Sequence, residues 1–416
     1  MRPNKGRGVW GEANRRLRNL VRGIHVKGDV KSKNNMLRIS IFLLLMLSFS
    51  GEFKGQPPDI NEISDSSWSA ISSFFSPPDA FKGNFGNYRS PLKFYNDTEV
   101  KNPADWTLRR EEILKRWNDM LGQWPPFVEH QKMEIIEKVR IDNYIRYKIS
   151  YNWLPGQKTE GYLLVPEGKG KRPAVITVYY EPETSAGIGD KEYRDFAHQL
   201  AKRGFVTLSI GTSETSKAKT YSLYYPDIKN SALQPLSVLA YAAANSWYML
   251  SELPEVDPER IGIMGHSYGG KWAMFASCLF EKFACAVWSD PGIVFDDSRP
   301  NVNYWEPWYL GYYPPPWDNT WRKSGDTDGA KGLYPVLRKE GYDLHELHAL
   351  MAPRPFLVSG GSEDSPARWI PLNHSVAVNK MLGYENRVGM TNRAEHSPNA
   401  ESNEHIYRFF EVFLKD

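Results

Sequence analysis

One short run of the chain restricts its possible folds more than any other feature. Residues 265–269 read GHSYG, which places Ser267 between two glycines, each two positions away. The run follows a short apolar, β-branched segment (260–264) and precedes apolar residues at helical spacing. A serine on a tight strand-to-helix turn requires small residues at these positions, because the backbone there approaches neighbouring backbone closely. The run therefore predicts a nucleophilic serine raised above the edge of a sheet.

Strand-like and helix-like segments alternate along most of the chain. Nine segments have the length and composition of strands: 133–140, 144–151, 161–165, 174–180, 205–210, 260–264, 284–288, 355–359 and 386–390. Helical periodicity marks 105–121, 191–203, 233–250, 371–382 and 403–414, in addition to the segment that begins at residue 268. Such alternation is typical of an α/β fold with a doubly wound, mostly parallel sheet. The first three strands predict an antiparallel start.

The base that would activate Ser267 is expected in a loop at the carboxyl edge of this sheet. A serine hydroxyl becomes a strong nucleophile only when a base takes its proton and a third group orients the base. His396 lies in a loop between the last strand and the last helix, whereas His374 and His405 lie inside predicted helices. We therefore predict that His396 is the base.

The acid of the expected triad is predicted after the next-to-last strand. There Gly361 is followed three residues later by Asp364, a step that would turn the carboxylate back toward the histidine loop. We therefore assign Asp364 as the acid. Its neighbour Glu363 and the earlier Asp290, which follows the strand 284–288, remain alternatives.

The remaining parts of the site follow from the same geometry. The oxyanion hole is expected to use the backbone N–H of Tyr268 and a second N–H after the strand that ends at Tyr179, at Tyr180 or Glu181. His345 and His348 are one residue short of the spacing of a zinc-binding pair, and no third ligand is evident. We therefore expect neither a metal nor a cofactor.

In these motifs the chain resembles the carbohydrate-esterase branch of the α/β-hydrolases, particularly the glucuronoyl esterases and their bacterial relatives. The resemblance spans about residues 100–416. It rests on Trp106-Thr-Leu-Arg109-Arg110, on the continuation of the serine turn to Gly270-Lys271, on Ala-Pro-Arg-Pro at 352–355, and on a histidine shortly before a Phe-rich last helix. The resemblance implies an α/β-hydrolase fold and a serine esterase that acts on an acylated or esterified carbohydrate through an acyl-enzyme.

The resemblance is incomplete at one position of the site. Glucuronoyl esterases have an arginine directly after the nucleophile, whereas this chain has Tyr268. The difference leaves ester chemistry intact and departs from the pattern for glucuronate. Some relatives place the acid after the earlier strand, which keeps Asp290 under consideration. The family likeness and the helical position of Lys271, one turn past Ser267, predict that this lysine contacts sugar hydroxyls; a structural bond is the alternative.

Residues 291–345 interrupt the alternation and are expected to form a lid beside the serine. Eight aromatic residues fall within 18 positions of this insertion: Tyr304, Trp305, Trp308, Tyr309, Tyr312, Tyr313, Trp317 and Trp321. Aromatic faces stack on sugars and line pockets, so Trp305 and Trp308 are candidate substrate-binding residues. Packing of the lid onto the domain is the alternative role.

The amino-terminal region predicts export. The first 50 residues carry 11 Lys and Arg against 2 Asp and Glu, and an apolar run at 39–49 ends in small residues, as in a secretory signal peptide. Met36, just before the run, is the expected true start. Residues 51–105 are expected to be an extended lead-in and 106–416 the α/β domain. We therefore expect a secreted or periplasmic protein with no stable membrane span after processing.

The composition also limits the possible partners. The 366 residues after the leader carry 41 Lys and Arg against 47 Asp and Glu, so no nucleic-acid footprint is expected. The expected partner is a small-molecule or polysaccharide ester. Two other functions remain open: a peptidase or amidase of the prolyl-oligopeptidase type, and a non-catalytic binding protein on the same scaffold. Residues 51–130 are too few for the propeller domain of the former.

Overall fold

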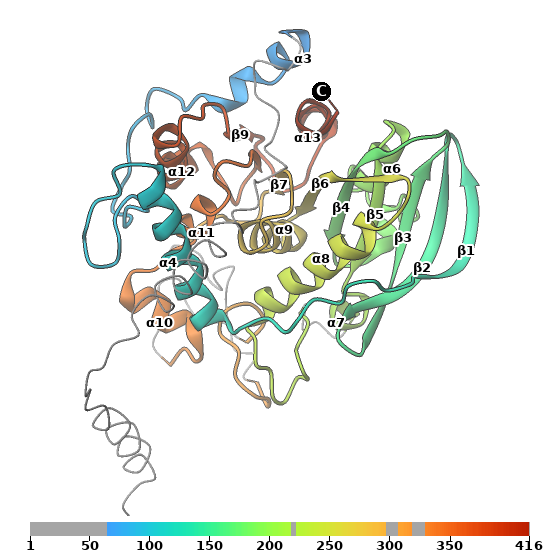
Figure 1. Ribbon diagram of the computed structural model, residues 1–416, viewed down its shortest axis with the longest axis horizontal. Coiled ribbons are helices and arrows are strands. Elements are labelled where there is room, and N and C mark those ends of the chain that lie inside the picture. Colours follow the sequence, from blue (N-terminus) through green and yellow to red (C-terminus); the bar gives the residue numbers. More distant parts are fainter. Residues whose placement is uncertain (1–64, 218–221, 297–306, 318–328, 416) are drawn as a thin grey trace, which may run out of the picture. The chain divides into compact units, whose positions relative to one another are not determined.

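The structure, a computed structural model, describes residues 65–217, 222–296, 307–317 and 329–415 (Figure 1). Residues 55–416 form one compact unit. The expected leader at 1–50 lies outside the described residues. Within the described part, no helix combines the length and the hydropathy needed to cross a bilayer.

A single nine-stranded sheet organises the described chain, in the order β1-β2-β3-β5-β4-β6-β7-β8-β9. The strands are β1 (Glu134–Ile141), β2 (Tyr144–Leu154), β3 (Gln157–Pro166), β4 (Arg172–Tyr179), β5 (Val206–Gly211), β6 (Val256–His266), β7 (Ala286–Ser289), β8 (Phe356–Gly360) and β9 (Val388–Asn392). The first three pair antiparallel and form one end of the sheet in Figure 1, and β3 pairs antiparallel with β5. From β5 to β9 every pairing is parallel. The expected doubly wound, mostly parallel sheet is confirmed.

Alternate residues of the central strands point to opposite faces of the sheet, and each face is covered. On β4, Ala174 and Ile176 belong to one apolar cluster, whereas Val175 belongs to the other. The larger cluster is covered by α4 (Pro103–Leu121), α8 (Pro235–Ser251), α9 (Tyr268–Leu279), α11 (His345–Ala349) and α12 (Trp369–Met381). The opposite face is covered by α6 (Phe196–Lys202) and α13 (Ala400–Leu414). Burial on both faces explains why these strands read as continuous apolar runs.

The Trp-x-x-Arg-Arg motif anchors α4 to the core. Arg109 is fully buried, and its guanidinium donates to the carbonyl of Pro91 at 3.2 Å and to the carboxylate of Glu112 at 2.6 Å. The carboxylate of Glu346, on α11, lies 3.6 Å from the same guanidinium and accepts from the indole of Trp117. A buried cation requires such partners. The motif therefore holds α4 against the core, and Arg109 has a structural role.

The described part of the lead-in is more ordered than expected. Residues 65–102 include α3 (Asp65–Ser69) and the 3-10 helix η2 (Ser72–Phe75). Phe74 and Phe75 are buried in the cluster that α13 covers, and the ring of Phe75 lies 5.9 Å from that of Phe413. These apolar residues have no periodicity in sequence, because the segment is too short to show one.

The insertion at 291–345 is partly described. It ends in α10 (Leu333–Glu340), and the chain then continues into α11. Of the eight aromatic residues, Tyr304, Trp305 and Trp321 lie outside the described residues. Tyr312 and Trp317 pack their rings against Tyr224, 5.7 and 5.8 Å between centroids. In the described part the insertion thus packs on the loop before α8, which is the alternative role considered for its aromatics.

Candidate active site

Ser267 stands alone between β6 and α9 in a conformation that few residues adopt. Its φ is 58° and its ψ is −117°, in the region of positive φ that disfavours side chains. A Cβ at Gly265 would lie 2.2 Å from the carbonyl oxygen of Gly269, and one at Gly269 would lie 2.0 Å from that of Val178. The two glycines are therefore steric requirements of the turn, as the sequence predicts.

His396 reaches this serine from the loop between β9 and α13. Its Nε2 lies 2.8 Å from the hydroxyl oxygen of Ser267. Its Nδ1 lies 2.7 Å from Oδ2 of Asp290. A carboxylate can only accept, so the Nδ1–H donates to Asp290 and Nε2 is left to accept the serine proton. The geometry agrees with the predicted pairing of Ser267 and His396.

The assignment of Asp364 as the acid is wrong in this geometry. Asp290, one residue beyond the end of β7, holds the histidine instead. Asp290 is fully buried and has a φ of 49°, which turns its carboxylate under the histidine loop. Glu363, the other alternative, donates its backbone N–H to Asp290 at 3.2 Å.

The carboxylates of Asp290 and Asp364 each accept hydrogen bonds from the backbone of the loop that carries the other. Asp290 accepts from the backbone N–H groups of Gly361 and Asp364 at 2.6 and 2.9 Å, in the loop after β8. Asp364 accepts from those of Gly292 and Ile293, both at 2.8 Å, in the loop after β7. The two carboxylates thus form a reciprocal clasp between neighbouring strands, in which only Asp290 touches the histidine.

Comparisons with known proteins find similar sequences over part of the chain. The prolyl oligopeptidase family matches residues 242–414. A 4-O-methyl-glucuronoyl methylesterase from Podospora anserina is 25% identical over 210 residues, which are 49% of this chain and 40% of that protein. The match thus spans less than half of the curated relative.

Solved structures share the fold across nearly their whole length. A glucuronoyl esterase from Solibacter usitatus has a TM-score of 0.58 at 16% identity, over 80% of this chain and 99% of that one. A promiscuous carbohydrate esterase of family 15 from a marine bacterial metagenome has a TM-score of 0.57 at 17% identity, over 82% and 100%. The chain has the fold of the α/β-hydrolases. The likeness to the solved structures concerns the fold.

Two further side chains, Arg393 and His266, contact the histidine loop. The guanidinium of Arg393 donates to the carbonyl oxygens of His396 at 2.6 Å and of Ser359, on β8, at 2.9 Å. The ring of His266 packs against that of His396, with the centroids 4.8 Å apart and the planes tilted by 39°. Burial, followed by the proximity of His396, lowers the pKa of His266 well below its ordinary value, so its ring is neutral. Sequence reasoning assigned no role to either residue, since neither fits a catalytic motif.

The two aspartates of the clasp have opposite pKa shifts. Burial alone would raise the pKa of Asp290, but its hydrogen bonds with His396 and with the backbone N–H groups hold it below the ordinary value. Burial, and then the charge of Asp290, raise the pKa of Asp364 to about 6. Asp290 therefore keeps its charge, which an orienting carboxylate requires.

The expected oxyanion donors belong to the residue after Ser267 and to the loop after β4. Tyr268 begins α9, and its ring stacks on that of Tyr180 at 4.8 Å. Glu181 precedes the short helix α5 (Pro182–Ser185), and its carboxylate accepts from Thr184 and Lys191. The loop after β4 therefore lies against the residue that follows Ser267, which is where a second oxyanion donor is expected.

The candidate substrate-binding residues have different surroundings. Lys271 is buried, with its ammonium 5.9 Å from the ring centre of Tyr309 in the insertion. Trp308 is half-buried, and its carbonyl accepts from the hydroxyl of Ser222. Trp305 lies outside the described residues.

The other histidines that follow Ser267 have structural surroundings. His374 and His345 bond the carbonyls of Phe85 at 3.0 Å and Arg89 at 2.6 Å. His348 is fully buried 5.1 Å from the ring of Trp288, and His405 packs against Phe74. Among the residues the structure describes, no three His, Cys, Asp or Glu side chains group so as to hold a metal.

Proposed function

We propose that the chain is a serine esterase that hydrolyses carboxylic esters of a carbohydrate, with Ser267, His396 and Asp290 as its catalytic triad. The observation that carries the proposal is the hydrogen-bonded series from Ser267 through His396 to buried Asp290, at 2.8 and 2.7 Å. Ser267 is also held at a positive φ of 58°, and such backbone strain is typical of catalytic turns.

The reaction follows from the order of these groups. The Oγ of Ser267 attacks the ester carbonyl while Nε2 of His396 takes its proton, and Asp290 stabilises the imidazolium that forms. The oxyanion is bound by the N–H of Tyr268 and by an N–H of the loop after β4, with Glu181 or Tyr180 as the donor. His396 then protonates the departing alcohol, and water releases the acid from the acyl-enzyme by the same steps.

The substrate class rests on the relatives. Those described above are glucuronoyl esterases and a carbohydrate esterase, which favours an ester on a polysaccharide or a small sugar. Tyr268 replaces their arginine, so glucuronate itself is not assumed. Lys271 and the insertion aromatics Trp305 and Trp308 are proposed to contact the sugar. No cofactor and no metal is needed for this chemistry.

A fluorophosphonate probe and a substrate panel test the proposal. The probe should label wild-type protein and leave Ser267→Ala unlabelled, since only an activated serine reacts. The panel compares acetylated and methyl-glucuronoyl sugars with peptides. Ester hydrolysis that disappears in Ser267→Ala supports the proposal, whereas absence of both labelling and turnover favours a binding protein.

A peptidase or amidase is the second candidate, because the prolyl oligopeptidase family matches residues 242–414. The same triad order serves both reactions, so the site geometry alone does not separate them. Cleavage of a prolyl peptide faster than any sugar ester, measured by kcat/KM, would favour the peptidase.

We propose that the esterase acts outside the cytoplasm, as its amino-terminal sequence predicts.

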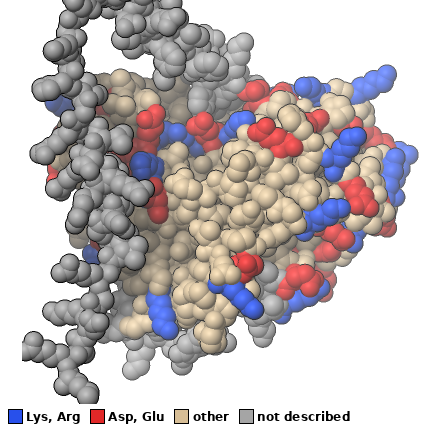
Figure 2. All heavy atoms as spheres, turned by 60° about the horizontal axis from the view of Figure 1, so that its bottom comes forward, with Lys and Arg blue, Asp and Glu red and all other residues tan. Residues whose placement is uncertain are grey.

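On the part of one face that the described residues form, Figure 2 shows basic and acidic side chains interspersed around a middle with few charges. Nucleic-acid binding requires clustered basic residues. This face therefore suits a neutral polysaccharide better than a polyanion.

A further inference from the structure

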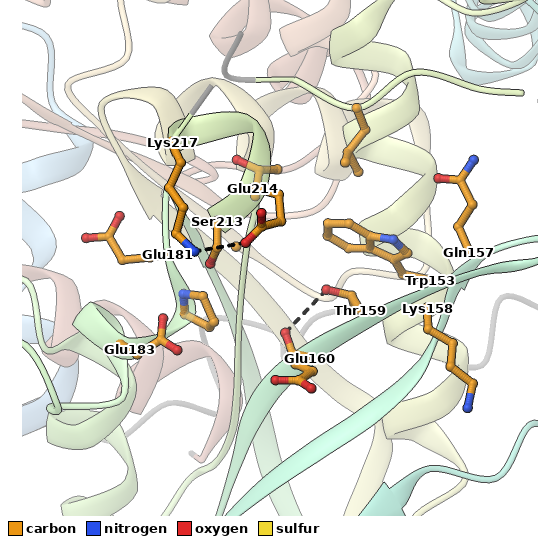
Figure 3. A pocket seen from close by; sticks show the side chains of 14 residues that line it. Trp153, Gln157, Lys158, Thr159, Glu160, Glu181, Glu183, Ser213, Glu214 and Lys217 are labelled. Carbon is orange, nitrogen blue, oxygen red and sulfur yellow. Dashed lines mark hydrogen bonds and ion pairs between the residues drawn. The ribbon is translucent and has the colours of Figure 1, made fainter. Parts of the chain in front are cut away.

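A cavity of about 800 Å³ lies close to the turn that holds Ser267, but none of the three proposed triad residues lines it. It lies between the β2–β3 hairpin and the loops that follow β4 and β5 (Figure 3). Trp153 and Leu223 supply apolar wall, and Thr159, Thr212 and Ser213 supply hydroxyls. Its volume is within the range of small-molecule sites, roughly 300–1,000 Å³.

One hydrogen bond joins this cavity to the nucleophile turn. Thr212 lines the cavity, and its hydroxyl lies 3.1 Å from that of Tyr268, the residue after Ser267. In the sheet, β4 and β5 lie on one side of β6, whereas the strands that carry Asp290 and His396 lie on the other. The departing alcohol must lie near His396, which protonates it, so the cavity is on the opposite side of the nucleophile.

The cavity wall favours donors of hydrogen bonds over anions. Its lining contains four glutamates against two lysines. Each glutamate already has one or two partners: Lys148 for Glu160, Thr184 and Lys191 for Glu181, Tyr162 for Glu183, and Lys217 for Glu214. An ionised carboxylate offers about four acceptor sites, so acceptor capacity remains. Hydroxyl groups can use it, whereas a carboxylate of the ligand would have to compete with these glutamates for lysines that already pair with them.

We propose that this cavity binds a neutral, hydroxyl-rich sugar of the substrate, one that carries no free carboxylate. The inference rests on the proposed esterase function and adds a place for the part of the carbohydrate distant from the departing alcohol. The apolar wall can pack against the C–H face of a sugar ring, and the carboxylate acceptors can bind the hydroxyl groups at its rim.

Filling the cavity tests the proposal. Thr159, half-buried on β3, lines it, so Thr159→Trp should occupy its volume. For a neutral oligosaccharide ester we expect KM to rise about tenfold or more with kcat unchanged, the signature of lost ground-state binding. Turnover of 4-nitrophenyl acetate should stay within about twofold. Thr107→Trp, on the exposed side of α4 and outside the cavity, is the matched control and should change neither.

A binding experiment separates failure of this inference from failure of the proposed function. In the Ser267→Ala background, calorimetry with a neutral xylo-oligosaccharide should detect binding that Thr159→Trp abolishes. The double substitution Glu183→Gln and Glu214→Gln should reduce the ratio of the affinity for the neutral oligosaccharide to the affinity for an oligosaccharide that bears a uronate. If Thr159→Trp changes neither KM nor binding, the cavity is not a sugar site, whatever the wild-type hydrolyses.

Discussion

At the residue scale, the two aspartates of the clasp make a direct comparison possible. Asp290→Asn should lower kcat by on the order of 10³–10⁴-fold, because the amide no longer fixes the histidine tautomer. Asp364→Asn should cost no more than about 10²-fold, because it displaces the loop of Asp290 without removing a catalytic group. Initial rates on one ester decide the order. A greater loss in Asp364→Asn would return the acid role to Asp364.

The raised pKa of Asp364 predicts how stability depends on pH. At a pKa of about 6 the folded protein keeps a proton that the unfolded chain, near 3.8, releases. This group therefore favours folding at low pH, and its contribution is lost as the pH rises from about 4 to 6. Between pH 4 and 7 the free energy of unfolding of Asp364→Asn should fall by about 2 kcal/mol less than that of wild type. Urea titrations at both pH values measure the difference. An equal fall in the free energy of unfolding for both proteins would contradict the raised pKa of Asp364.

The pairing of Ser267 with His396 could be predicted from the sequence, whereas the contact of His396 with Asp290 rather than Asp364 could not. Ser267 is marked by steric requirements for glycine, and His396 by its position between a strand and a helix. Two aspartates follow neighbouring strands, and nothing local distinguishes them. The choice depends on the positive φ of Asp290 and on Gly361, where a Cβ would lie 2.7 Å from the carboxylate of Asp290. Such three-dimensional contacts have no pattern in sequence.

At the element scale, the loop between β9 and α13 depends on one guanidinium. Arg393 is half-exposed, yet it bonds carbonyls of both the histidine loop and β8. Arg393→Met should lower kcat by about 10- to 100-fold and leave KM within about threefold, because the base is misplaced while substrate contacts remain. Arg393→Lys should recover only part, since an ammonium lacks the planar fork.

The matched control for this prediction is Arg408→Met on α13. Arg408 is exposed and pairs with Glu404 one turn away. Its loss should leave kcat unchanged, as for most surface ion pairs. If the two methionine variants lose activity equally, Arg393 has no special role in positioning His396.

The elements that sequence could predict are those with long or buried patterns. All nine strands lie near their predicted segments, because burial on both faces gives continuous apolar runs. Five short helices were not predicted: α3, α5, α7 (Ser213–Lys217), α10 and α11. One or two helical turns are fixed by tertiary packing and caps rather than by periodicity. The sequence also understated β6, which begins at Val256 rather than near residue 260.

At the scale of the whole molecule, the sheet order separates two tasks. Asp290 and His396, the proposed acid and base, follow β7 and β9 on one side of Ser267, and the loops after β4 and β5 line the cavity on the other side. The clasp of Asp290 and Asp364 holds the loops after β7 and β8 together. The hydrogen bond between Thr212 and Tyr268 joins the cavity wall to the turn that holds Ser267. Substrate selection can therefore vary in the loops without disturbing the triad.

Export of the chain is the prediction that belongs to this scale. A basic flank, an apolar run at 39–49 and small residues at its end predict cleavage near Ser50. Residues 55–416 form a compact unit by themselves, so the processed chain should keep the Tm and the kcat of the uncleaved chain. Amino-terminal sequencing of protein recovered from the periplasm or medium measures the cleavage point. A mature chain that begins at Met1 or Met36 would contradict the signal peptide. A cleaved chain that melts at lower temperature would show that the leader contributes to the fold.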